Sequence, residues 1–328
     1  MPLLERRPAL GRLFERLPVV DRRVLTGAAI ALVAVAIAGY VTGHGHARPP
    51  EREQTLTASA AGVLLTLPQD WQTVASAPPI PGLTLAHAIQ LAPNGETSHA
   101  GLIAGEIPGR DPSPLPRDLL DRMRGLPATS VVGLLEVQAY RYTGFHIPGY
   151  GSQLVVYVIP NPGAERTALA CYASPALLSQ MQTCQHSVTT LTLAGRTQSY
   201  DLTPQASYAH GLSASIGALE SSRLALRRQM ISHPAPATLA GVATRLAQSF
   251  AKAASSISAL QPNLATGQAQ SALSGALLRA RSAYAALAGA ALAESEPRFA
   301  AARDRVNDGE ARVDEALATF ALLGYEPA

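Results

Sequence analysis

Residues 167–193, TALACYASPALLSQMQTCQHSVTTLTL, join a β-type run to a segment with helical spacing and contain both cysteines of the chain. The run Thr167–Tyr172 is short and apolar, which is typical of a buried strand. In Pro175–Leu193 the apolar residues recur at intervals of three and four, which predicts a helix that begins at a proline. A strand followed by a helix that folds back on it predicts an α+β domain.

The two cysteines, Cys171 and Cys184, have 12 residues between them. In an exported protein such a pair is expected to form a disulfide, which contributes about 3 kcal/mol to stability. The bond would pin the helix to the strand that ends at Cys171. The alternative is a reactive pair, but the chain has neither a CxxC spacing nor a signature of a catalytic cysteine.

Upstream of this unit, short β-type runs are separated by turn residues from about residue 56 onward. We therefore expect an α+β domain over residues 56–195, with an antiparallel sheet and helices on one of its faces. The expected strands are 63–67, 83–91, 100–107, 131–142 and 153–159, and the expected short helix is 116–124.

The opening of this domain, VLLTLPQDW at Val63–Trp71, resembles the strand-Pro-x-x-Trp opening of the PsbP and Mog1 family. The closing unit CYASPALLSQMQTCQHSVTTLTL resembles that of exported, membrane-anchored actinobacterial proteins of unknown function, and similar ectodomains follow some serine/threonine kinase domains. The resemblance covers about residues 56–195. PsbP-like domains are mostly accessory or binding modules, so the resemblance implies no catalytic residues.

Downstream, residues 204–324 are rich in Ala, Ser and Leu, and their apolar positions alternate at intervals of three and four. Breakers at 233–236, 261–263 and 294–297 divide this region into four segments of about 25 residues. Short loops between helices of similar length predict an up-down-up-down four-helix bundle.

One seam position of this bundle is charged, because Arg223 stands where an apolar residue is expected. A buried guanidinium without a carboxylate is costly, so we expect Arg223 to pair with Glu310 or with Glu220. The alternative is that the Arg223 side chain reaches past the bundle edge into solvent.

The N-terminal region contains an uncharged run of 19 residues, VLTGAAIALVAVAIAGYVT at Val24–Thr42, which is long enough to span a bilayer as a helix. Residues 1–23 hold six arginines and three acidic residues, so the positive-inside rule predicts a cytoplasmic tail. A linker over 43–55 then leads to extracytoplasmic domains. The alternative is a signal peptide that is cleaved after Ala47.

The tail accounts for the whole net charge of +3, since the rest of the chain has 20 basic and 20 acidic residues. The exported part is therefore neutral, and we expect no nucleic-acid partner.

The segment 140–150, YRYTGFHIPGY, gathers aromatic residues beside Gly and Pro. Aromatic side chains near turns are favoured at binding surfaces, which makes this segment a candidate partner surface. The alternative is that alternate tyrosines fill the core face of a strand. The candidate residues are Tyr140, Arg141, Tyr142, Phe145, His146 and Tyr150.

No motif for acyl transfer, phosphoryl transfer or zinc binding occurs, and the eight histidines are dispersed. We therefore expect no enzyme activity, no cofactor and no metal site. The expected function is a membrane-anchored extracytoplasmic module that binds an unknown ligand or partner or senses an extracytoplasmic condition. The alternatives are an enzyme that acts on the cell envelope through an unfamiliar site, or a spacer or oligomerisation element.

Overall fold

The computed structural model describes residues 55–60, 62–96, 98–109, 111–161, 166–193, 200–232 and 235–326. The predicted cytoplasmic tail (1–23) and transmembrane helix (24–42), and all but the last residue of the predicted linker, lie outside these ranges. Within these ranges, no helix combines the length and the hydropathy needed to cross a membrane.

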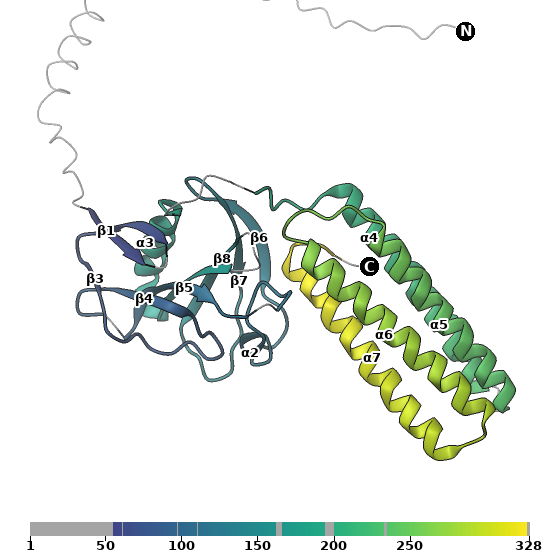
Figure 1. Cartoon of the computed structure of the whole chain (residues 1–328). Helices are drawn as coiled ribbons and strands as arrows, with labels where there is room; N and C mark the ends of the chain where they lie inside the picture. Colours follow the sequence, from purple (N-terminus) through teal and green to yellow (C-terminus); the bar gives the residue numbers. More distant parts are fainter. Residues whose placement is uncertain are drawn as a thin grey trace, which may run out of the picture. The chain divides into compact units, whose positions relative to one another are not determined.

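The first half of the described chain forms a seven-stranded antiparallel sheet (Figure 1) with the strand order β3-β4-β5-β9-β8-β7-β6. The prediction of a mixed α+β domain with an antiparallel sheet is therefore confirmed. Its strands are β3 (Trp71–Thr73), β4 (Ala86–Pro93), β5 (Ala100–Ile107), β6 (Ala128–Gly133), β7 (Gln138–Thr143), β8 (Gln153–Pro160) and β9 (Arg166–Ala173).

Several predicted boundaries shift by a few residues, and two predicted elements differ more. The single strand predicted over 131–142 is a hairpin of β6 and β7, closed by a hydrogen bond from the Leu134 amide to the Val137 carbonyl. Its turn contains Leu135, which is 68% exposed. Because this turn residue is apolar, the sequence pattern did not indicate that the strand ends there. The helix predicted to run to Leu193 ends at Thr189. Thr192 and Leu193 instead form a short strand that pairs with the strand beginning at Val63.

That last pairing belongs to a small antiparallel sheet with the order β1-β2-β10. Its strands are β1 (Thr55–Ala60), β2 (Val63–Pro68) and β10 (Thr192–Leu193). Between β9 and β10 the chain forms a 3₁₀ turn, η1 (Pro175–Leu177), and the helix α3 (Leu178–Thr189).

Both faces of the large sheet are buried, and alternate residues of its central strands belong to different hydrophobic clusters. In β8, Val155 and Tyr157 pack with α3 and the small sheet, whereas Val156 and Val158 pack in the opposite cluster. The short helix α2 (Arg117–Leu120) contributes Leu119 to that opposite cluster. Helices therefore lie on both faces, and the prediction that they cover one face is wrong.

The second half of the described chain contains four long helices that lie side by side in Figure 1. Consecutive helices contact one another, and we call residues 206–322 the helical region. The helices are α4 (Ala206–Ser232), α5 (Pro236–Ser258), α6 (Gly267–Leu292) and α7 (Glu296–Leu322).

The sheet and the helical region share a hydrophobic cluster, and residues 54–328 form one compact unit. The buried hydroxyl of Tyr142 on β7 donates a hydrogen bond of 2.7 Å to the carbonyl oxygen of Leu322, at the end of α7. The side-chain oxygen of Gln138 accepts the Leu202 amide at 2.8 Å, just before α4. The helical region is thus joined to the sheet at both of its ends.

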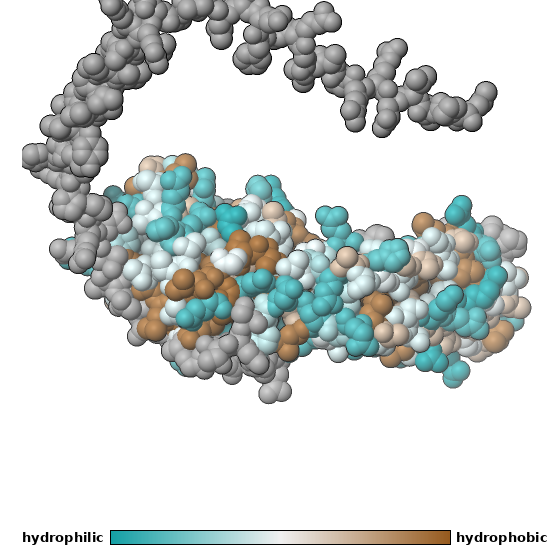
Figure 2. Space-filling view, turned by 90° about the horizontal axis from the view of Figure 1, so that it is seen from above, coloured by the Kyte–Doolittle hydropathy of each residue, from teal (hydrophilic) through white to brown (hydrophobic). Residues whose placement is uncertain are grey.

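Large apolar side chains that stay exposed are dispersed over many elements. Figure 2 shows this on one face, where hydrophobic residues lie in patches among hydrophilic ones. The exposed examples are Leu126, Leu135, Leu178, Leu224, Leu264, Leu278 and Leu292.

Two tyrosines of β7 give a matched test of the junction, because Tyr140 and Tyr142 are both fully buried but only the Tyr142 hydroxyl has a partner. We expect Tyr142→Phe to lower the free energy of unfolding by about 1–3 kcal/mol, since it leaves the Leu322 carbonyl without its donor. Tyr140→Phe removes an unpartnered buried hydroxyl and should leave stability equal or higher. Urea denaturation of both variants measures this, and an equal effect of the two substitutions would contradict the assigned bond.

Candidate functional site

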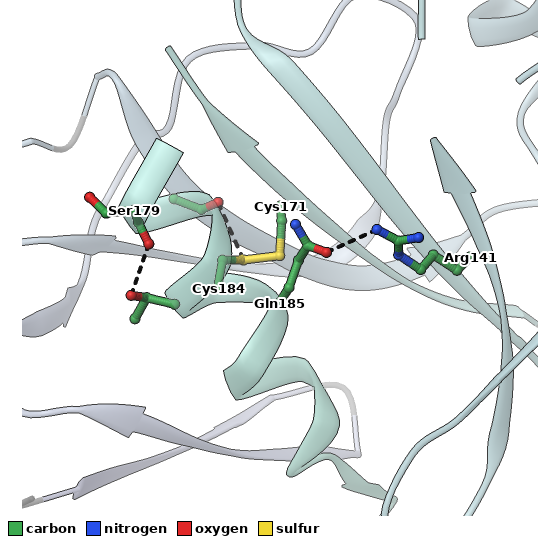
Figure 3. The surroundings of a disulfide bond; sticks show 7 residues. Arg141, Cys171, Ser179, Cys184 and Gln185 are labelled. Carbon is green, nitrogen blue, oxygen red and sulfur yellow. Dashed lines mark hydrogen bonds between the residues drawn. A yellow bond between two sulfur atoms is a disulfide. The ribbon is translucent and has the colours of Figure 1, made fainter. Parts of the chain in front are cut away.

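The predicted disulfide between Cys171 and Cys184 is present, and it joins β9 to α3 with Cα atoms 5.9 Å apart. Both cysteines are fully buried, so the bond is shielded from exchange with outside thiols. Figure 3 shows the surroundings of the disulfide, where Arg141 on β7 donates a hydrogen bond of 3.0 Å to Gln185 on α3. Two cross-links of different chemistry therefore hold α3 on the sheet.

The aromatic segment predicted as a partner surface is mostly turned toward the interior of the protein. Tyr140 and Tyr142 are fully buried and point into the cluster shared with the helical region. Phe145 and Tyr150 are half-buried and pack against the same cluster, while Arg141 lies on the other face of the sheet. Of the six residues only His146 is exposed, because alternation along β7 turns its tyrosines inward.

A charged cluster lies inside the helical region, with the carboxylate of Glu310 at its centre. The structure places Arg223 beside both predicted partners, with its Nη2 3.3 Å from Glu310 Oε1 and its Nη1 against Glu220. The Arg223 side chain is only 11% exposed, so it does not reach out into solvent. Arg227, one helical turn further along α4, contacts the other oxygen of Glu310.

Two aromatic residues complete this cluster, and neither was predicted to take part in it. The Tyr284 hydroxyl on α6 donates a hydrogen bond of 2.6 Å to Glu310. The Phe250 ring on α5 stacks on Tyr284 and lies 5.9 Å from the Arg223 guanidinium carbon. Burial and the adjacent carboxylate raise the pKa of Tyr284 to about 12, so this hydroxyl stays a donor at neutral pH. All four helices therefore meet at one polar network.

The Glu310 carboxylate has its partners within this network, which favours a structural role, although the buried Nε of Arg223 has no hydrogen-bond partner among the described residues. The acidic group accepts three donors and lies only 10% exposed, so no open coordination position or free nucleophile remains there. Across the ranges that the structure describes, no group of three or more His, Cys, Asp or Glu side chains is placed to hold a metal ion. The contacts of the cluster hold α4, α6 and α7 together.

A groove of about 620 Å³ lies where the sheet meets the end of α7, and we call it the junction groove. This volume is in the range of small-ligand sites. Its apolar floor includes Leu317 and Ala318, and Thr129 on β6 contributes a buried hydroxyl that has no partner among the described residues. The carboxylates of Asp314 and Glu326 also line it, so the groove presents an apolar surface with negative charge.

No local pattern in the sequence indicates this groove, because its walls come from two distant segments, 127–129 and 314–326. In the sequence, Asp314 cannot be distinguished from other acidic residues on an exposed helix face, and Thr129 cannot be distinguished from other polar residues of a strand. Only the contact between β6 and α7 brings them together.

The central position of Glu310 predicts a large effect of its neutralisation. Glu310→Gln leaves two guanidinium groups without their shared carboxylate, and we expect a loss of about 3 kcal/mol or more in unfolding free energy. The matched control is Glu315→Gln on the same helix, which removes an exposed pair with Arg117 and should cost under about 1 kcal/mol. Chemical denaturation measures both. Equal, small losses would show that the Glu310 network contributes little.

Comparison with known proteins gives limited similarity. The sequence matches no protein-family model and no curated protein. The chain is similar to the solution structure of cyanobacterial PsbP (CyanoP) from Synechocystis sp. PCC 6803, at 11% identity, over 46% of this chain and 99% of that one, with a TM-score of 0.30.

A crystal structure from Bacteroides thetaiotaomicron VPI-5482 matches at 9% identity, over 70% of this chain and 77% of that one, with a TM-score of 0.28. The first of these structures is a PsbP protein, and neither structure bears on Mog1, membrane anchoring or kinases. At these TM-scores neither neighbour carries an argument about function.

Proposed function

We propose that this protein is a single-pass membrane protein whose extracytoplasmic part is a non-catalytic binding module, with the junction groove as its ligand site. The apolar run at 24–42 and the arginines before it favour an anchor with a cytoplasmic N-terminus. The Cys171–Cys184 disulfide supports an oxidising compartment for the folded part. A role as an accessory module also fits the PsbP-like opening of the sheet.

The observation that carries the binding proposal is the shared hydrophobic cluster of sheet and helical region. Because the two parts are packed together, the groove between them is a fixed surface and not a gap between two independent domains. An up-down-up-down four-helix bundle is a suitable scaffold for this purpose, since α7 and the residues directly after it supply seven of the nine residues that line the groove.

The chemistry of the groove indicates the kind of ligand. Asp314 and Glu326 make no ion pair among the described residues, and no basic residue lines the groove. A ligand that combines an apolar part with a positive charge would bury the former on Leu317 and Ala318 and neutralise the carboxylates. An exposed lysine or arginine on an envelope protein has this character.

Blocking the groove tests this function. We expect Ala318→Trp, which fills the apolar floor, to abolish recovery of a partner when the full chain is purified from envelope extract at normal expression. The matched control is Ala301→Trp on the first turns of the same helix, at an exposed position outside the groove. Recovery of the same partner by wild type and Ala301→Trp, but not by Ala318→Trp, supports the proposal.

Two results would reject it. One is a partner that binds the Ala318→Trp variant as well as wild type, and the other is the absence of any specific partner in all three preparations. Far-UV circular dichroism on each purified variant checks that the tryptophan has not unfolded the helices.

A further inference from the structure

A second groove, of about 490 Å³, runs between α6 and α7, and its charge is opposite to that of the junction groove. Arg279 on α6 and both Arg305 and Arg312 on α7 line it, together with a single acidic residue, Asp308. Three positive groups and one negative group leave a local formal charge of +2.

The groove exists because α6 and α7 approach closely at small residues. A Cβ atom on Gly309 would lie 3.1 Å from the Cα of Ala280, so a larger residue at 309 would push the helices apart. Ala283 and Ala286 of α6 also line the groove, and their side chains are small. Long arginine side chains therefore flank a shallow floor made of small residues.

The three guanidinium groups in this groove are not used by the fold. Arg279, Arg305 and Arg312 form no ion pair within the part of the chain that the structure describes. By contrast, Arg117 and Arg223 each bind carboxylates elsewhere in the structure. Helix neighbours three or four positions apart can pair, yet Asp308 pairs with neither Arg305 nor Arg312.

Guanidinium groups that line one groove from two helices suit one class of ligand. A guanidinium presents a planar set of donors that matches the oxygens of a phosphate group, often with two parallel hydrogen bonds. The adjacent Asp308 carboxylate can accept a hydroxyl group beside that phosphate. A hydroxyl-bearing phosphate ester combines both features.

We propose that the α6–α7 groove binds a hydroxyl-bearing phosphate ester, of the kind found in free glycerol phosphate and in the headgroup of phosphatidylglycerol. Arg279 holds the phosphate from α6, Arg305 and Arg312 hold it from α7, and Asp308 orients the hydroxyl groups. This site is independent of the junction groove.

Hydrogen exchange of the full chain, reconstituted in phosphatidylcholine bilayers, tests the site. The two probes are sn-glycerol 3-phosphate in solution and phosphatidylglycerol mixed into the bilayer. We expect one of them to slow exchange in residues 278–286 and 305–312, with an affinity that falls as salt rises. Protection by the soluble ester assigns a free ligand, and protection by phosphatidylglycerol alone assigns a lipid headgroup.

Matched variants separate a built site from general attraction. Arg279→Gln with Arg312→Gln removes one groove charge from each helix, and we expect at least about a tenfold loss of affinity. Arg281→Gln with Arg303→Gln removes two exposed arginines from the same helices outside the groove, and should change affinity little.

The proposal would be overturned if neither probe slowed hydrogen exchange in the groove. It would also be overturned if the two double variants lowered the affinity for the probe equally. Thermal unfolding of each variant confirms that the exposed substitutions leave the fold intact. Recovery of a partner through the junction groove is measured separately, so either proposal can fail alone.

Discussion

The hydrogen bond from the Tyr142 hydroxyl to the Leu322 carbonyl connects β7, the strand beside the β6 edge of the sheet, to the last turn of α7, 180 residues later. It lies inside a hydrophobic cluster to which both halves of the molecule contribute. Both faces of the large sheet need cover, because the consecutive residues 154–159 of β8 and 168–173 of β9 are apolar and buried. The α3 helix and the small sheet cover one face, and loops, α2 and the helical region complete the other.

A second constraint acts within the helical region, where a buried carboxylate collects donors from two neighbouring helices. Because Glu310 is satisfied by Arg223, Arg227 and Tyr284, it fixes α7 against α4 and α6. Gly309, the residue directly before Glu310, allows the close contact with α6 beside the α6–α7 groove. Two surfaces of opposite charge, at different places on α7, thus depend on how that helix is held. We propose binding roles for these two surfaces because the charged groups that line them form no ion pair among the described residues.

Much of the fold could be predicted from the sequence where the signal is local. The strand at 100–107 agrees with β5, and the loops between α4 and α7 occur at the predicted proline-containing breakers. The disulfide followed from cysteine count and compartment. The β6–β7 hairpin was missed because Leu134 and Leu135 occupy its turn in place of Gly or Asn.

The sites were harder to predict, because they depend on contacts between distant segments. A charged seam position pointed to Arg223 and its carboxylates, but nothing local identified Arg227 or Tyr284 as further partners of Glu310. The tyrosines of segment 140–150 have the composition of a binding surface, and only the packing of the helical region shows that they are core. Both grooves likewise arise from tertiary packing.

The central claim is that sheet and helical region form one folding unit around a shared core. The only tryptophan of the chain, Trp71, is buried in the sheet, whereas α4–α7 dominate the far-UV circular dichroism. Urea unfolding of the full chain, with the disulfide intact, can be followed by both signals in one titration. The account predicts coincident transitions with the same midpoint. Two separate transitions, with the helices and the environment of Trp71 changing at different urea concentrations, would contradict it.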